Sequence, residues 1–169
     1  MDKRFILIIF IIIIGVFNLF IISEHSDVIG SASVDVSKYT FSLPKDFILL
    51  NTNNQNEVSI SNTKTGLRIM VSVIPTYNAS YKLASIENDT TKTLLSNGTI
   101  NRNDIRIDSM YYNPVKPDNN HSSAAIFYFN KSNASFKISM DNFNYETQRE
   151  ETIDALSGII DSIRINHKR

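Results

Sequence analysis

The chain has 169 residues, of which 17 are basic and 17 are acidic, so its formal net charge at pH 7 is zero. This balance leaves no basic surface of the kind that nucleic-acid binding requires, and we expect no nucleic-acid partner. Cysteine is absent, which excludes disulfides, thiolate metal sites, cysteine nucleophiles and a lipid attached to cysteine.

An apolar run near the start of the chain, Phe5–Ile22, predicts a membrane anchor. As a helix, its eighteen residues would be about 27 Å long, close to the ~30 Å hydrocarbon core of a bilayer. Lys3 and Arg4 precede the run, whereas Glu24 and Asp27 follow it. Because basic residues stay on the cytoplasmic side, we expect a single-pass protein with its N-terminus in the cytoplasm and its C-terminal domain outside the cell membrane.

A cleaved signal peptide is the alternative interpretation of this run. Gly30–Ala32 supplies small residues suited to cleavage, and cleavage would make the protein secreted. The run is longer than the ~7–15 apolar residues of a typical signal peptide, which favours a retained anchor. We therefore divide the chain into an anchor at residues 1–22, a polar spacer at residues 23–37 and one domain at residues 38–169.

The first part of the domain alternates apolar and polar residues in the manner of β-strands. Polar turns separate the segments, and the turn at Asn62–Gly66 suits a hairpin. Leu67–Pro75 is apolar on both faces, so we expect a central strand that is covered on both sides. The predicted strands are Tyr39–Leu43, Phe47–Leu50, Val58–Ser61 and Leu67–Pro75.

The spacing of apolar residues then changes, and it predicts a helix at Asn78–Asn97. Asn78 or Ser80 suits the cap at its start, and Asn97 followed by Gly98 suits a C-terminal cap. The buried stripe of this helix would comprise Leu83, Ile86, Thr90 and Leu94.

Three more strands follow this predicted helix. Thr99–Asp104 is expected to be a loop, and Val115–Ser123 is expected to be an exposed loop. The turn at Asn130–Asn133 joins the last two strands as a hairpin. The predicted strands are Ile105–Tyr112, Ala124–Phe129 and Ser135–Met140.

The last predicted element is a helix at Tyr145–Ile163. Asn144, or Thr147 together with Glu150, suits the cap at its start. The order of elements is therefore β-β-β-β-α-β-β-β-α. The buried stripe of the last helix would comprise Ile153, Leu156, Ile160 and Ile163.

This order, with three local phrases, resembles the PsbP-like family, the relatives of the extrinsic subunit of the photosynthetic oxygen-evolving complex. The phrases are Tyr39–Pro44, the strand Leu67–Pro75 running into a helix, and Ile159–Arg164, within a resemblance that covers Val34–Arg164. It implies an α+β fold in which two helices sandwich an antiparallel sheet. It also implies a non-enzymatic binding or assembly subunit, without a cofactor, metal or partner site that carries over.

No residue pattern in the sequence points to catalysis, and we assign no catalytic, cofactor-binding or metal-binding residue. The three histidines, His25, His121 and His167, are far apart in the sequence. A nucleophile motif of the Gly-x-Ser-x-Gly type and a glycine-rich phosphate loop are both absent. Paired carboxylates could support acid–base chemistry, but Asp104 and Asp108 flank a short strand, and Asp118 and Asp141 lie near turns. Turns favour aspartate for its backbone hydrogen bonds, so we expect structural roles for all four.

Two kinds of surface site are expected. One is a candidate interaction surface, made of two tyrosines before the Val115–Ser123 loop and three polar residues in that loop: Tyr111, Tyr112, Lys116, Asp118 and His121. Six Asn-x-Ser/Thr sequons are candidate glycosylation sites, at Asn78, Asn88, Asn97, Asn120, Asn130 and Asn133.

These observations favour a membrane-anchored extracytoplasmic module that acts by binding, held by Phe5–Ile22 with a protein partner at the outer face of the membrane. Two alternatives stay open. One is a secreted hydrolase or small-ligand-processing enzyme whose site is carried by loops. The other is a passive glycosylated surface protein.

Overall fold

The computed structural model describes residues 32–50, 54–75, 89–114 and 122–166. The chain divides into two units, Met1–Ser31 and Ala32–Arg169, and the described residues all belong to the second. The predicted anchor Phe5–Ile22 lies outside them. Within the described ranges, no helix is long and apolar enough to span a membrane.

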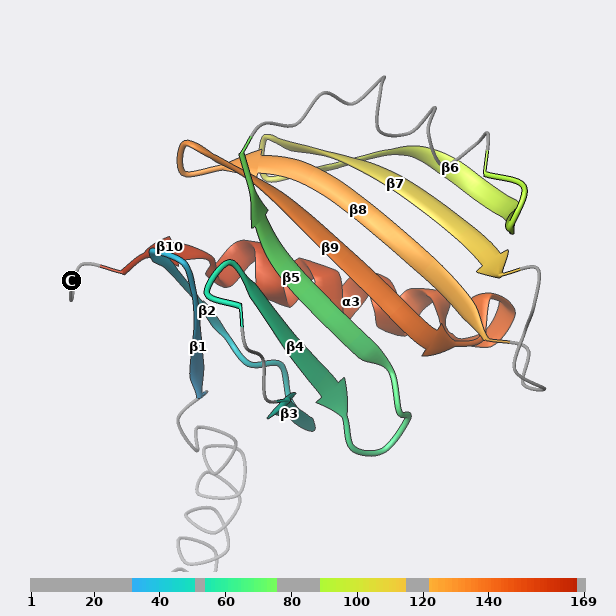
Figure 1. Cartoon of the computed structure of the whole chain (residues 1–169), viewed down its shortest axis with the longest axis horizontal. Coiled ribbons are helices and arrows are strands. Elements are labelled where there is room, and N and C mark those ends of the chain that lie inside the picture. Colours follow the sequence, from blue (N-terminus) through green and yellow to red (C-terminus); the bar gives the residue numbers. More distant parts are fainter. Residues whose placement is uncertain (1–31, 51–53, 76–88, 115–121, 167–169) are drawn as a thin grey trace, which may run out of the picture. The chain divides into compact units, whose positions relative to one another are not determined.

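The second unit is an α+β domain built on antiparallel strands (Figure 1). Seven strands form one sheet in the order β3-β4-β5-β9-β8-β7-β6, so β3 and β6 are its two edges. A second, three-stranded sheet has the order β1-β2-β10. The described elements are β1 (Ser33–Val36), β2 (Tyr39–Ser42), β3 (Phe47–Leu50), β4 (Glu57–Asn62), β5 (Arg68–Ile74), β6 (Lys92–Arg102), β7 (Ile105–Pro114), β8 (Ser123–Lys131), β9 (Ala134–Phe143), α3 (Tyr145–Ser162) and β10 (Arg164–Ile165).

The hydrophobic core lies between one face of the large sheet and a layer made of α3 and the small sheet. Helix α3 runs across the back of β5 and β9 in Figure 1. At the centre, the Phe129 and Phe136 rings stack at 5.3 Å, and the ring of Tyr39 from the small sheet meets Phe136 edge-on at 5.2 Å. The aromatic contacts therefore join the two sheets.

The final helix forms nearly where the sequence predicted it. Asn144 is its N-cap, because the Asn144 side chain accepts hydrogen bonds from the backbone N–H groups of Glu146 and Thr147. Leu156, Ile160 and the adjoining Ile163 are buried as predicted. Ile153 is only half-buried, and Thr152 takes the fully buried position beside it.

The cap leads to a first prediction about stability. Asn144→Ala should lower the free energy of unfolding by about 1 kcal/mol, because two N–H groups of the first turn lose their acceptor. Asn144→Asp keeps an acceptor at the same place and should change stability by less than about 0.5 kcal/mol. Urea unfolding of the two variants, followed by far-UV circular dichroism, compares them. Equal losses in both would show that the cap does not contribute.

Both predicted hairpin turns are confirmed. Asn62–Gly66 connects β4 to β5, and Asn130–Asn133 covers the connection between β8 and β9. Ser132 and Asn133 both have positive φ, at 51° and 60°, as the tight two-residue turn of a hairpin requires. The strand predicted at Leu67–Pro75 is central, as β5 between β4 and β9.

Two boundaries predicted from the sequence are wrong. Ser33–Val36 was assigned to the spacer, but it forms β1 and pairs with β2, and Val34 and Val36 are buried in the core. The helix predicted at Asn78–Asn97 does not extend over its last third, because Lys92–Arg102 is strand β6. Residues 78–88 of that prediction lie outside the described residues.

The structure therefore does not show the predicted sandwich of two helices around the sheet. One helix, α3, is present in the described ranges, and it covers one face. The expected loop at Thr99–Asp104 is also wrong: Thr99–Arg102 continues β6, and Asn103 and Asp104 form the two-residue turn into β7. Both turn residues have positive φ, at 46° and 64°.

Candidate functional site

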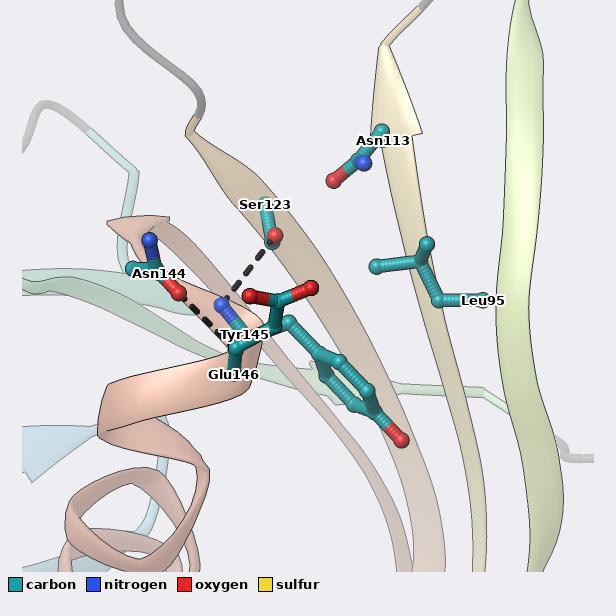
Figure 2. A pocket seen from close by; sticks show the side chains of 6 residues that line it. All are labelled: Leu95, Asn113, Ser123, Asn144, Tyr145 and Glu146. Carbon is teal, nitrogen blue, oxygen red and sulfur yellow. Dashed lines mark hydrogen bonds between the residues drawn. The ribbon is translucent and has the colours of Figure 1, made fainter.

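A cavity of about 360 Å³ lies where α3 begins, under the ends of β6, β7 and β8 (Figure 2). The cavity occupies a corner of the domain, close to the β6 edge of the large sheet. Its walls are Leu95, Asn113, Ser123, Asn144, Tyr145 and Glu146.

The start of α3 does not offer free N–H donors to a ligand in this cavity. The Tyr145 N–H donates to Ser123 Oγ at 3.3 Å. The Glu146 and Thr147 N–H groups donate to Asn144 Oδ1 at 2.9 Å and 3.2 Å. The next one, of Gln148, donates to the Asn144 carbonyl. An anion bound at a helix N-terminus accepts hydrogen bonds from these N–H groups, and here they already have acceptors. The lining side chains therefore determine which ligands the cavity can bind.

Leu95 and Tyr145 give the cavity one apolar wall, and the other four lining residues are polar. Leu95 is 37% exposed, and the Tyr145 ring faces the same cavity (Figure 2). The Tyr145 ring is fixed by an edge-on contact with Tyr111 at 5.1 Å and by the Arg149 guanidinium 5.6 Å from its centre. Such a wall suits an apolar or aromatic side chain of a partner.

Polar recognition in the cavity rests on Glu146 and Asn113. Glu146 is the one charged residue among the lining residues. The Asn113 Oδ1 atom is buried and accepts no hydrogen bond within the described part of the chain. Glu146 is therefore the one carboxylate in the wall of the cavity.

Of the predicted interaction surface, the structure describes Tyr111 and Tyr112, which it places on opposite faces of the sheet. Tyr111 is buried in the core, 2% exposed, with its ring edge-on to Phe127 at 5.6 Å. Tyr112 points to the other face of the sheet, where the Lys92 ammonium lies 5.4 Å from its ring centre. Burial raises the pKa of both phenols above their ordinary value of 10.0. Lys116, Asp118 and His121 lie outside the described residues.

Three of the six sequons lie in the described ranges. Asn97 is exposed on β6, and Asn130 and Asn133 are exposed at the β8–β9 hairpin. Asn78, Asn88 and Asn120 lie outside the described residues. Glycosylation at any of the six stays a prediction.

Two of the four aspartates considered for acid–base chemistry, Asp108 and Asp141, have structural partners. The buried Asp108 accepts hydrogen bonds from Arg106 Nε and from the Thr99 hydroxyl, both at 3.1 Å. Asp141 lies 3.4 Å from Arg68 Nε in an exposed ion pair on the neighbouring strand. In the parts of the chain that the structure describes, no three histidine or acidic side chains gather in a way that would hold a metal ion.

Most of the cavity residues carried no signal in the sequence. Asn144 was predicted as a helix cap, and it lines the cavity in that role. Leu95 was missed because it fell inside the predicted helix. Asn113 and Ser123 come from strands that become neighbours of α3 only after the sheet has formed, and no motif links them.

The sequence matches no protein-family model, and no curated protein matches it. Solved structures do match the fold. The solution structure of cyanobacterial PsbP (CyanoP) from Synechocystis sp. PCC 6803 aligns with a TM-score of 0.50 and 14% identity, over 81% of this chain and 94% of that one. The fold is PsbP-like.

A second solved structure supports the same PsbP-like architecture. LpqN, described as involved in cell envelope biogenesis of Mycobacterium tuberculosis, aligns with a TM-score of 0.51 and 10% identity. The alignment covers 81% of this chain and 86% of LpqN. At identities this low, the similarity shows the PsbP-like fold and does not show a shared activity.

Proposed function

We propose that this protein is a membrane-anchored, extracytoplasmic binding module without catalytic activity, which holds a protein partner of the cell envelope. The apolar run Phe5–Ile22 and the charges on either side of it support the anchor and its orientation. The PsbP-like fold, which this chain shares with a protein of cell envelope biogenesis, supports the setting.

The observation that carries the proposal is the position of the cavity beside the edge strand β6. Among the described strands, β6 pairs with β7 alone, so its second side is an edge of the sheet. Between Lys92 and Arg102 the strand has no charged residue, and Leu94 and Leu95 are 43% and 37% exposed. A partner that lies along this edge would place an apolar side chain against Leu95 and Tyr145.

The two alternatives make different demands on this surface. A glycan on Asn97 would stand on β6 and shield the edge, so a passive glycosylated protein and a binding module exclude one another at this residue. A hydrolase needs a nucleophile, or a second acid–base group that works together with Glu146, in the cavity or on a loop. Mass spectrometry of Asn97 in the native protein addresses the first alternative.

Site-specific photocrosslinking in cells of the native organism tests the proposal. A photoreactive residue at position 95 should give a discrete adduct with one protein. The same residue at position 64 is a matched control, because the Lys64 side chain is 69% exposed at the turn between β4 and β5. No adduct from position 95, or the same adducts from both positions, would contradict a specific partner at the cavity.

The contribution of Leu95 to that partner is also predicted. Leu95→Ala should weaken binding of the identified partner about tenfold, because burial of a leucine side chain is worth roughly 1.5 kcal/mol or more. Lys64→Ala should leave the affinity unchanged. Titration of the full-length protein with the purified partner measures both, and equal affinities for both variants would place the contact elsewhere.

A further inference from the structure

The edge strand β3, at the far side of the large sheet from the cavity, exposes two large apolar side chains. Ile48 is 50% exposed and Leu49 is 55% exposed, the highest values among the large apolar residues of the described ranges. They belong to a run of four apolar residues, Phe47–Leu50. Edge strands of soluble proteins usually carry charged residues or proline, so a run of this kind indicates a contact.

The pairing of β3 explains why both side chains remain exposed. Leu49 pairs with Ile60 and is the last member of a core-facing row that continues into Ile69. Ile48 points to the other face, where its neighbour on β4 is Ser61. The two side chains therefore lie on opposite faces of the sheet at its edge, and neither is buried in the core.

The strand lies close to the point where the chain enters the domain. The Leu43 N–H donates to the carbonyl of Ala32 at 2.8 Å, and the Phe47 N–H donates to the carbonyl of Pro44 at 3.2 Å. The first described residue, Ala32, is thus tied to Leu43, which lies four positions before the start of β3. The predicted anchor ends at Ile22, and ten residues of extended chain span at most about 35 Å, so the bilayer surface is within reach of β3.

We propose that the β3 edge rests in the interfacial region of the bilayer, with Ile48 and Leu49 inserted beside the lipid headgroups. This inference rests on the proposed membrane anchoring. A bilayer suits this edge because its interface accepts apolar side chains from both faces of one strand, together with an exposed lysine such as Lys45 next to it.

The orientation has a consequence for the cavity. Six strand-to-strand steps separate β3 from β6 in the order of the large sheet. At about 4.8 Å per step, the β6 edge stands roughly 29 Å from β3. A domain standing on its β3 edge would therefore hold the cavity and β6 away from the lipid, where a partner can approach.

Fluorescent labelling at single cysteines tests this contact, since the chain has no cysteine of its own. Full-length Ile48→Cys carries an environment-sensitive NBD label and is reconstituted into vesicles of phosphatidylcholine and phosphatidylglycerol. Leu94→Cys, on β6, is the matched control because Leu94, like Ile48, is a partly exposed aliphatic residue on an edge strand. We expect at least threefold stronger quenching by nitroxide-labelled lipid, and a blue-shifted emission, at position 48.

The outcomes separate this inference from the anchoring. Protein that fails to float with the vesicles overturns the anchor and this contact together. Protein that floats but gives equal quenching at both positions overturns the contact alone. A disulfide that forms between two copies of the unlabelled Ile48→Cys variant would instead assign the edge to a second copy of the chain. Leu49→Cys repeats the measurement if the first variant does not fold.

Discussion

Replacing Phe136 by alanine should lower the free energy of unfolding by about 3–5 kcal/mol, the largest stability effect that we expect from one substitution. The Phe136 side chain has no exposed surface and lies on the central strand β9. Its ring stacks on Phe129 and receives the edge of Tyr39. Because strands lie on both sides of β9, the surrounding backbone has little freedom to close the cavity that alanine would leave.

Urea unfolding of the full-length protein in mild detergent, followed by far-UV circular dichroism, measures this loss. Phe136→Leu keeps most of the volume and should cost less than the alanine change by about 2 kcal/mol. Glu150→Ala, on the exposed side of α3, should stay within about 0.5 kcal/mol of the parent protein. A loss below about 1 kcal/mol for Phe136→Ala would contradict a close-packed junction between the two sheets.

The strands of the large sheet were predictable where one face of each strand is buried. In β4, buried positions alternate with half-buried ones along Val58–Asn62, and the sequence has the same period. β9 shows the same agreement at Phe136, Ile138 and Met140. For these strands, the alternation of apolar and polar residues in the local sequence was sufficient to predict which side chains face the core.

Strand β6 was mistaken for a helix because it is an edge strand with most of its side chains exposed. Because most positions of β6 are exposed, its sequence does not alternate between apolar and polar residues. Leu94 also fell at a position that matched the helical spacing of the predicted buried stripe. What determines the strand is its pairing with β7 over ten positions, from Lys92 opposite Pro114 to Arg102 opposite Ile105. Tertiary pairing of this kind overrides a weak local preference.

The small sheet was missed for a different reason. β10 has two residues, and its partners Thr40 and Tyr39 are more than 120 positions earlier in the sequence. β1 lay in a polar segment that read as a spacer, although Val34 and Val36 alternate with Ser33 and Asp35. That alternation is the one signal that the sequence offered for it.

The candidate site was less predictable than the fold, because its residues meet only through the sheet. Tyr111 and Tyr112 are neighbours in the sequence, and this suggested one aromatic surface. Strand geometry directs neighbouring side chains to opposite faces, which puts Tyr111 in the core and Tyr112 on the other side. The cavity instead joins Leu95 of β6 to Tyr145 of α3, which are 50 positions apart.

Gly66→Ala should lower the free energy of unfolding by about 2–3 kcal/mol, because left-handed backbone strain and a weakened hydrogen bond act together. Gly66 has φ of +76° in the turn between β4 and β5. A Cβ atom there would lie 2.9 Å from Asn142 Nδ2, the atom that donates to the Gly66 carbonyl at 2.8 Å. Alanine would therefore strain the turn and displace the side chain that ties it to the end of β9.

Gly158→Ala is the matched control, because the same substitution should have the opposite sign there. Gly158 lies on the exposed side of α3, and a Cβ atom at this position meets nothing within 4 Å. Alanine in a helix interior removes freedom from the unfolded chain and should stabilise the protein by about 0.5–1 kcal/mol. Urea unfolding of the two variants tests both signs. If Gly66→Ala were as stable as the parent protein, the link between the β4–β5 turn and Asn142 would not hold the hairpin in place.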